Sequence, residues 1–340
     1  MAMSGRLLTV IGTVVGTDQT CSVPGRTISE NLSFIRDLIE YVEREDLPVA
    51  LLSLDQEKAF DRVDWGFLLR TLDRFNFGPS FCKWIKLFYT DVESAVVING
   101  WTSTFFKPSR GVRQGCPLSP LLYVLCIEIL AVNIRTSPHV TGVYLPDSIE
   151  QYKCSGYADD TTIAVTTDES IEESRTNTPF GLSWVKELPL LGTTFSVGDY
   201  TIPTWEKPAA KLESRLSAWS GRSLSLQGKK TIINVLALSQ IWHLCHVFAI
   251  PAWASKRITK ALWSFFWSGK KDLVARTTVC LPKSRRGFGV IDFERKAESF
   301  ALQWVKRFFA PERAKWKSFL KFFITSCLGR SPQEAFEYSS

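Results

Sequence analysis

Two adjacent aspartates, Asp159 and Asp160, are the residues of this sequence best placed to do chemistry. They follow Tyr157 and Ala158 and precede residues 162–166, an apolar run rich in β-branched residues that predicts a strand. The stretch before them also has strand character, which places the pair at or near a hairpin turn. Adjacent carboxylates repel each other and stay ionised together more easily when a cation lies between them. The alternative is a solvated turn, because Asp is common in turns.

A third carboxylate, Asp55, ends a nearly continuous apolar run over residues 49–54. Such a run predicts a strand that is buried on both faces. If this strand shares a sheet with the strands around Asp159 and Asp160, the three acids meet at one edge. Carboxylate oxygens suit Mg²⁺, and two such ions about 3.5–4 Å apart can clamp an in-line phosphoryl displacement. The pattern therefore predicts a two-magnesium site for phosphoryl transfer.

A second stretch with chemistry is the Gly-rich loop, residues 110–120. Gly111 and Gly115 let the backbone approach a ligand closely. Donors for phosphates or bases come from Arg110, Arg113 and Gln114. Ser119 and Pro120 are suited to the start of a long apolar helix that ends near Arg135. The alternative is an ordinary loop that leads into a helix.

The surrounding elements are predicted from hydrophobic periodicity and turn signals. Further helices are expected over about residues 30–45, 64–75 and 79–89. A hairpin is expected around Asn99-Gly100, and a strand pair with a tight bend near residues 188–195. The aromatic residues of the helix over residues 79–89 are expected to be buried, as is Ile85; they are Phe81, Trp84 and Phe88. The mixture predicts an α+β fold that becomes helical throughout after Trp205.

Charge is distributed unevenly along the 340 residues. The net charge is +7, but from Trp205 onward there are 24 Lys and Arg against 9 Asp and Glu. That part also contains eight of the twelve tryptophans, which is typical of a nucleic-acid cradle, since cations hold phosphates and flat rings stack on bases. Lys229 and Lys230 are candidate contacts to the nucleic-acid backbone. The alternative is a helical bundle with a Trp-rich core and a solvated basic face.

Composition indicates a globular protein, with 45% hydrophobic and 22% charged residues. The eight scattered cysteines are expected to be reduced thiols of an intracellular protein. No apolar run reaches the ~20 residues of a membrane span, and the run from Leu7 to Val15 lacks the features of a signal peptide. We therefore expect no membrane partner and a location in the nucleus or the cytoplasm. The sequence gives no prediction of the oligomeric state.

Three ordered motifs resemble the reverse transcriptases of non-LTR (LINE-type) retrotransposons. They are LDQEKAFD at residues 54–61, GVRQGCPLSP at residues 111–120 and YADD at residues 157–160. The run PGRTI at residues 24–28 is similar to the finger motif just upstream, and LLG at residues 190–192 is similar to the primer-grip turn. The segment from Trp205 to about Gly269 is similar to the helical thumb of that family.

The resemblance implies roles for the residues at matching positions. Asp55, Asp159 and Asp160 match the acids that bind two Mg²⁺ ions and carry catalysis. Phe60 matches the bulky residue beneath the incoming sugar that excludes a 2′-hydroxyl. The positions that contact template and nucleotide are matched by Arg113, Gln114, Gly115 and Tyr157. The turn that supports the primer end is matched by Leu191 and Gly192.

The resemblance also implies a right-hand fold and RNA-directed DNA synthesis, with an RNA template, a DNA primer and deoxynucleoside triphosphates as partners. Its parts are partial fingers at residues 1–47, an antiparallel palm sheet with helices at 48–200, a helical thumb at 205–270 and a basic helical segment at 271–340. The sequence departs from the family at its start, which follows the finger strands, and near residues 168–187. Only 29 residues separate Asp160 from Leu190, where the family has a further palm helix and strand. Two alternatives therefore stay open: a non-catalytic nucleic-acid-binding remnant, and a broken gene copy without a stable product.

Overall fold

The computed structural model describes residues 2–146, 148–166, 185–196, 198, 201–311 and 314–329. The chain forms two compact units. The first contains Met1–Phe34, Arg44–Leu182 and Ser318–Ser340, and the second contains Ile35–Glu43 and Ser183–Lys317. Helices and small antiparallel sheets occur together, so the fold is α+β, as predicted. The predicted shortening near residues 168–187 falls mainly outside the described residues.

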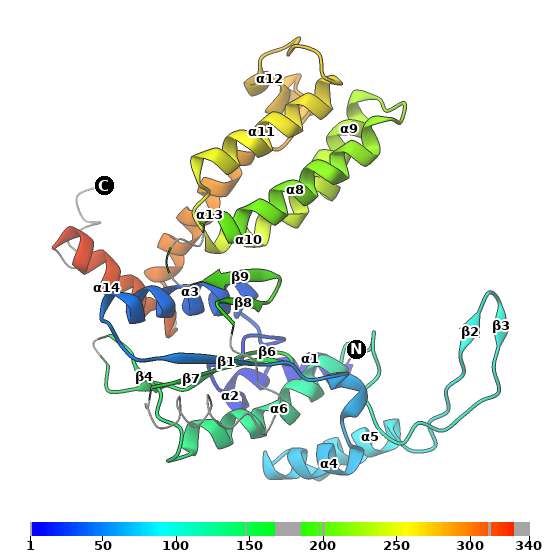
Figure 1. The fold of residues 1–340 in the computed structure, drawn as a ribbon. Coiled ribbons are helices and arrows are strands. Elements are labelled where there is room, and N and C mark those ends of the chain that lie inside the picture. Colours follow the sequence, from blue (N-terminus) through cyan, green and yellow to red (C-terminus); the bar gives the residue numbers. More distant parts are fainter. Residues whose placement is uncertain are drawn as a thin grey trace. The chain divides into compact units, whose positions relative to one another are not determined.

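The first unit is built on a three-stranded antiparallel sheet in the order β1-β7-β6 (Figure 1). Its strands are β1 (Ala50–Leu54), β6 (Cys154–Tyr157) and β7 (Asp160–Val165). The prediction that β1 is buried on both faces was wrong, because all five of its residues are only half-buried. β1 pairs with β7 on one side and is an edge strand of the described sheet. Two short strands, β4 (Val143–Tyr144) and β5 (Gln151–Tyr152), form a separate pair.

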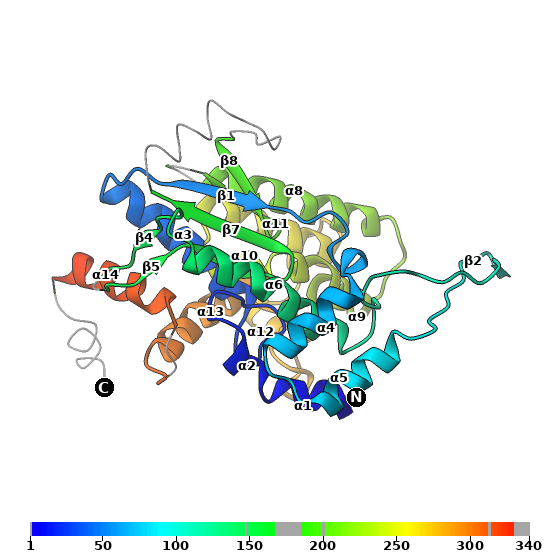
Figure 2. The same ribbon diagram turned by 90° about the horizontal axis from the view of Figure 1, so that it is seen from below.

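Helices supply most of the core of the first unit. They are α1 (Ala2–Leu8), α2 (Ile11–Val14), α4 (Trp65–Arg74), α5 (Pro79–Phe88), α6 (Ser119–Thr136) and the 3₁₀ turn η1 (Ala59–Arg62). α6 contacts α4 and β6, and Figure 2 shows it beside the sheet. Among the described residues, α6 is the one helix long and apolar enough to cross a membrane, and half of it is buried inside this fold. The long apolar stretch is therefore accounted for by its place in the core.

The prediction for the aromatic residues of α5 was partly wrong. Ile85 is fully buried, whereas Trp84 and Phe88 are 55% and 44% exposed. The rings of Trp84 and Phe88 lie 6.3 Å apart, as expected for side chains four residues apart on one helix stripe. Phe81 and Ile85 lie on an adjacent face of the same helix, and that face packs against the core. Hydrophobicity alone did not show which of the two stripes meets the core.

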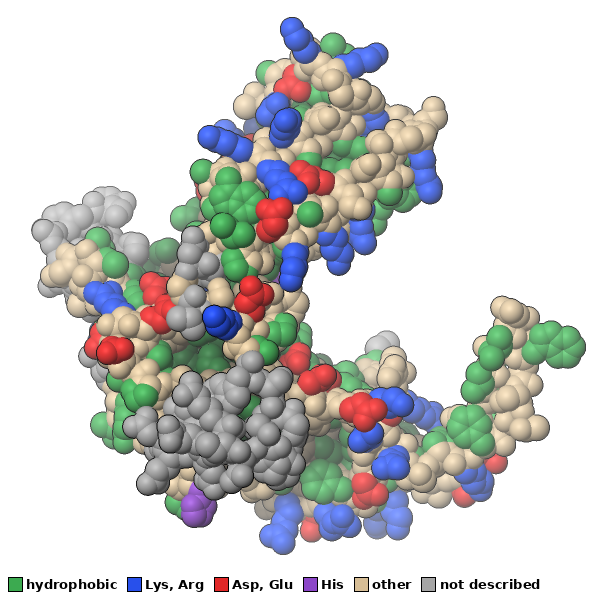
Figure 3. Space-filling view, viewed as in Figure 1, with side chains coloured by type: hydrophobic (Ala, Val, Ile, Leu, Met, Phe, Trp, Pro, Cys, Tyr) green, Lys and Arg blue, Asp and Glu red, His purple; other side chains and the backbone are tan. Residues whose placement is uncertain are grey.

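The Asn-Gly hairpin is confirmed. β2 (Val97–Ile98) pairs with β3 (Trp101–Thr102), and Asn99 and Gly100 both have positive φ, at 51° and 84°, as a tight two-residue hairpin turn requires. Its large apolar side chains are 50–84% exposed, and Figure 3 shows them on the projecting arm; they are Val96, Val97, Ile98, Trp101, Phe105 and Phe106. The sequence has no charged residue from Ser94 to Phe106.

The second unit is helical after one hairpin, as predicted. Its elements are β8 (Glu187–Leu190), β9 (Thr193–Ser196), α8 (Thr201–Ser220), α9 (Leu226–Thr231), the π-helix η2 (Ile232–Ala237), η3 (Leu238–Gln240), α10 (Trp242–Val247), α11 (Ala252–Trp267), α12 (Arg276–Cys280), η4 (Lys283–Arg285) and α13 (Phe293–Phe308). α3 (Ile28–Arg44) and α14 (Trp316–Leu328) contribute residues to both units. Trp205 is fully buried in α8, and Trp263 and Trp267 are also buried, so these rings belong to the core. All eight cysteines are free thiols.

Candidate active site

The paired aspartates lie at a two-residue turn, Ala158-Asp159, between β6 and β7. Tyr157 and Asp160 form the last pair of the ladder on either side of that turn. Ala158 has a φ of 55°, a left-handed conformation that costs a residue with a β-carbon roughly 1–2 kcal/mol. Tyr157, predicted to contact nucleotide or template, is partly exposed at the end of β6. The hairpin turn predicted from the sequence is therefore present, and its first residue is strained.

The register of the sheet brings Asp55 to the same place. Its predecessor Leu54 pairs with Thr161, so the chain leaves β1 next to Asp160. Burial raises the pKa of Asp160 above its ordinary value, and the negative charges of Asp159 and Asp55 raise it further. The structure thus gathers the three acids at one edge of one sheet, here called the acid edge, while their catalytic role stays a prediction.

The acid edge is rich in oxygen ligands and is not neutralised by a neighbouring basic group within the described residues. None of its three carboxylates forms an ion pair with Lys, Arg or His there. The described part of the chain also contains no group of three or more His, Cys, Asp or Glu side chains that could hold a metal ion as they stand. Mg²⁺ is usually bound by one or two carboxylates together with waters and substrate phosphates. The acid edge fits that cation on condition that substrate supplies the remaining ligands.

Tyr123 of α6 also reaches the acid edge, although its sequence context did not indicate this position. Its ring stacks on Phe60, with 4.5 Å between the centroids and 13° between the planes. Its hydroxyl donates a hydrogen bond to Gln56 Oε1 at 3.0 Å. Burial raises the pKa of Tyr123, and the charge of Asp159 raises it further, so the hydroxyl stays protonated. Phe60 is therefore held in place beside the acids. The available signal was a tyrosine one turn into the helix that follows the Gly-rich loop.

The Gly-rich loop is fastened to the segment that follows Asp55 in the chain. Gly111 donates its N–H to Val63 O at 2.8 Å. Its φ is 100°, and a β-carbon there would lie 3.1 Å from Asp61 O, so this position requires glycine. Gln114 Nε2 donates to Asp61 Oδ1 at 3.4 Å, which places Gln114 beside the same segment. Gly115 has a φ of 80° and open space around it.

A groove of about 900 Å³ lies between α1, α5 and the Gly-rich loop. The exposed rings of Trp84 and Phe88 form part of its wall, and Arg6 and Arg113 also line it. α1 and α5 contain no acidic residue. Arg113, predicted to contact template or nucleotide, thus lies at a groove lined by aromatic rings and basic groups. Flat rings with cations are the combination that binds unpaired nucleotides.

In the second unit, Leu191 and Gly192 form the turn between β8 and β9, as predicted. Both have positive φ, at 50° and 78°. Burial lowers the pKa of His243, and a backbone hydrogen bond with Gly192 opposes that shift. The turn is therefore supported from α10, and its role at a primer end stays a prediction.

The two lysines of α9 differ in their surroundings. The Lys229 ammonium donates to Phe266 O at 3.3 Å and also contacts Ser268 Oγ, so it satisfies the carbonyl end of α11. Lys230 makes no such polar contact within the described residues. Figure 3 shows further Lys and Arg side chains spread over α8, α9, α11 and α12. Of the two predicted backbone contacts, Lys230 is the one whose charge is available to a ligand.

The chain is similar in sequence to one protein family and to proteins of transposable elements. A family model described as "Reverse transcriptase (RNA-dependent DNA polymerase)" matches residues 1–185. The "Transposon TX1 uncharacterized 149 kDa protein" of Xenopus laevis is 33% identical over 353 residues, which cover 93% of this chain and 27% of that protein. The Pol polyprotein of the retrotransposable element R2DM of Drosophila melanogaster is 27% identical over 138 residues, 41% of this chain and 13% of that protein. The chain thus spans about a quarter or less of these relatives.

Among solved structures, apo telomerase from Candida tropicalis matches with a TM-score of 0.46 and 10% identity, over 94% of this chain and 60% of that one. Telomerase from Candida albicans in complex with a fragment of telomeric RNA matches with a TM-score of 0.44 and 10% identity, over 87% of this chain and 53% of that one.

Proposed function

This chain belongs to the reverse transcriptase family, and on that premise we propose that it adds deoxynucleotides to a DNA primer along an RNA template. The family binds nucleic acids and generally uses divalent metal ions. The observation that carries the proposal is the register of β1, β7 and β6, which gathers Asp55, Asp159 and Asp160 at the acid edge. The attachment of the Gly-rich loop to the segment after Asp55 supports it further.

In the proposed reaction, the 3′-hydroxyl of the primer loses its proton to solvent and attacks the α-phosphorus of a deoxynucleoside triphosphate. The new oxygen–phosphorus bond forms as the bond to the β-phosphate breaks, and pyrophosphate leaves with the electron pair of the broken bond. Asp55, Asp159 and Asp160 would hold two Mg²⁺ ions. When bound, such ions activate the attacking hydroxyl and stabilise the leaving pyrophosphate. The Ala158-Asp159 turn orients two of these carboxylates, and the stacked Phe60 would lie beneath the incoming sugar.

The remaining predicted roles follow the right-hand arrangement. We propose partial fingers at residues 1–47, a palm at 48–200, a thumb at 205–270 and a basic segment at 271–340. Gln114, Gly115 and Tyr157 would contact template and nucleotide, and Arg113 would hold unpaired template at the groove beside α5. Leu191 and Gly192 would support the primer end. Because RNA templates and deoxynucleoside triphosphates are found inside cells, we propose an intracellular place of action.

Replacing Phe60 with valine is expected to weaken the exclusion of ribonucleotides. The smaller side chain leaves room for a 2′-hydroxyl, and a contact of this size changes the ratio of the two kcat/KM values by about tenfold or more. The measurement is single-nucleotide extension with a deoxynucleotide and with the matching ribonucleotide. Phe309→Val, at a half-exposed ring in the second unit, is the control. An unchanged ratio in the Phe60 variant would remove Phe60 from the nucleotide site.

Replacing Lys230 with alanine is expected to weaken binding of a primer–template duplex and to reduce the slope of log affinity against log salt by about 1, as for one lost phosphate contact. Lys229→Ala is the matched comparison. Because the Lys229 ammonium is already bonded at the end of α11, its loss should lower thermal stability and leave the salt slope nearly unchanged. Fluorescence anisotropy over a series of salt concentrations measures both slopes. Equal slopes for the two variants would contradict the assignment.

The proposed function is tested by primer extension on an RNA template with Mg²⁺, comparing the chain with its Asp159→Ala variant. Extension by the chain and not by the variant is the expected result. A folded chain that extends no better than the variant would overturn the polymerase assignment. It would favour a non-catalytic nucleic-acid-binding protein, in which salt-dependent binding persists after Asp55 or Asp159 is changed. The 29-residue interval between Asp160 and Leu190 is the observation that keeps this second candidate in view.

A further inference from the structure

We propose that Gln19 is a positioning residue for the Ala158-Asp159 turn between β6 and β7. Its side-chain amide holds Ala158 in the left-handed conformation that directs Asp159 and Asp160 into the acid edge. This inference rests on the proposed function, because it concerns the orientation of the same acids. Gln19 lies 139 residues before Ala158 in the chain.

The side chain of Gln19 bonds both backbone groups of a single residue. Gln19 Oε1 accepts from the Ala158 N–H at 3.1 Å, and Gln19 Nε2 donates to Ala158 O at 3.4 Å. The same Oε1 also accepts from the Cys21 N–H at 2.9 Å. Gln19 is 4% exposed, so these bonds are made largely out of competition with water. A primary amide matches this task because one end accepts while the other donates.

Ala158 needs such support because of its backbone conformation. Its φ is 55°, whereas φ is not positive at Asp159, the other residue of the turn. Two-residue hairpin turns with this feature at the first position normally have glycine there. This chain has alanine, whose β-carbon disfavours the left-handed region. The two hydrogen bonds between Gln19 and Ala158 stabilise the positive φ of Ala158, which alanine disfavours.

Gln19 is itself fixed along the free edge of β6. The Thr20 N–H donates to Gly156 O at 3.0 Å, and the Gly156 N–H donates to Asp18 O at 2.9 Å, so residues 18–20 run parallel to this part of the strand. Gly156 makes room for the amide. A β-carbon at that position would lie 2.9 Å from Gln19 Nε2, closer than such atoms approach. The glycine before Tyr157 therefore serves the same contact.

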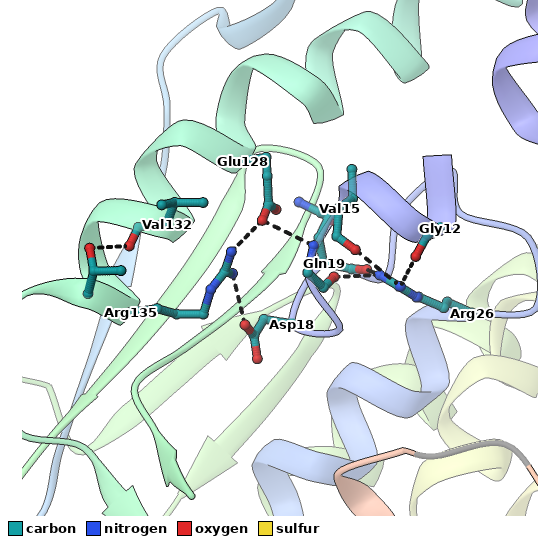
Figure 4. A network of polar contacts seen from close by, with 10 residues as sticks. Gly12, Val15, Asp18, Gln19, Arg26, Glu128, Val132 and Arg135 are labelled. Carbon is teal, nitrogen blue, oxygen red and sulfur yellow. Dashed lines mark hydrogen bonds and ion pairs between the residues drawn. The ribbon is translucent and has the colours of Figure 1, made fainter. Parts of the chain in front are cut away.

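A buried polar network anchors the segment that contains Gln19 (Figure 4). Arg26 donates to Gln19 O at 2.8 Å. Arg135 of α6 pairs with Asp18 at 2.9 Å and with Glu128, and Glu128 Oε1 accepts from the Gly16 N–H at 3.0 Å. Charged groups from α6 thus hold the chain just before Gln19, through the Gly16 N–H and the Asp18 side chain. The amide has little freedom to leave Ala158.

The test begins with Gln19→Met, which nearly keeps the volume of the side chain and removes its three hydrogen bonds, two to Ala158 and one from the Cys21 N–H. We expect kcat for primer extension to fall at least tenfold, with a much smaller change in the KM for nucleotide, because the acids and not the nucleotide contacts are displaced. Gln303→Met, at an exposed glutamine of α13, is the matched control. Adding Ala158→Gly to Gln19→Met should restore part of the lost kcat, because glycine adopts positive φ without a steric cost. A loss that Ala158→Gly does not reduce would point to direct contact of Gln19 with substrate and overturn the positioning role.

A second readout decides the question without catalysis. In protein labelled at alanine methyl groups, the Ala158 signal is the one missing from the Ala158→Gly variant. We expect this signal to shift or broaden in Gln19→Met and to stay in place in Gln303→Met. An unmoved Ala158 signal would overturn the proposal, whether or not the chain polymerises. Failure of wild-type extension would overturn the proposed function alone. If Gln19→Met does not fold, Gly156→Ala displaces the same amide, and the same shift of the Ala158 signal is expected.

Discussion

Replacing Asp160 with asparagine is expected to abolish primer extension and, in protein freed of divalent cations, to raise the melting temperature. Asparagine has nearly the same shape but no charge, so the variant loses a metal ligand. It also removes the two causes that raise the pKa of Asp160, which are first the burial of its charge and then the repulsion from Asp159 and Asp55. Several kcal/mol of lost metal-ion stabilisation correspond to roughly a thousandfold or more in rate. Asp160 is partly exposed, so solvent screening limits the gain in stability to about 1 kcal/mol or less.

The two halves of this expectation are measured separately. Extension of a labelled primer gives the rate, and thermal unfolding in a chelating buffer gives the stability. Added Mg²⁺ should raise the melting temperature of the wild type more than that of the variant, since an ion that binds the folded state stabilises it. Asp73→Asn, at an exposed position of α4, controls for loss of one negative charge. A variant that still extends primers, or that melts earlier in the chelator, would show that Asp160 does not belong to a repulsive metal site.

Replacing Arg135 with methionine is expected to lower the free energy of unfolding by about 3–5 kcal/mol, the usual cost of leaving a buried charge without its partner. Two carboxylates depend on this guanidinium. The side chains of Asp18 and Glu128 are 4% and 2% exposed, and both pair with Arg135. Urea unfolding measures the change, and the midpoint should fall without a change in the slope of the transition.

Two further variants test whether the cost of Arg135→Met comes from the burial of its carboxylate partners. Arg276→Met removes an exposed ion pair with Asp272 and should cost at most about 1 kcal/mol. Combining Arg135→Met with Glu128→Gln should recover part of the loss, because one of the two buried carboxylates that lose Arg135 is then uncharged. Equal costs for Arg135→Met and Arg276→Met would show that the network contributes no more than a surface pair.

The parts of the site that the sequence predicted well are those set by local pattern and strand ends. An apolar run that stops at Asp55 and a β-branched run that begins after Asp160 are visible without a structure. Because β7 pairs with both neighbouring strands, their register places the acids together. Turns with strong local signals, at Asn99-Gly100 and Leu191-Gly192, were predicted for the same reason.

The parts that could not be predicted depend on neighbours that are remote in the chain. Burial of Trp84 and Phe88 depends on which stripe of α5 meets the core, and periodicity does not decide between two apolar stripes. Tyr123 stacks on Phe60, which lies 63 positions earlier in the sequence. Gln19 acts on a turn 139 residues away, and nothing in the local pattern of an isolated glutamine indicates such a contact.

The exposed hairpin of β2 and β3 has a consequence for the behaviour of the protein in solution. Thirteen successive residues without charge, from Ser94 to Phe106, present six large apolar side chains on short strands that have open edges. Segments of this composition pair readily with identical segments of other molecules. The net charge of +7 resides mainly elsewhere in the sequence and does little to keep two such arms apart. This hairpin is therefore expected to promote self-association, and a single lysine in place of Val97 is expected to improve solubility more than the same charge added to the basic helices.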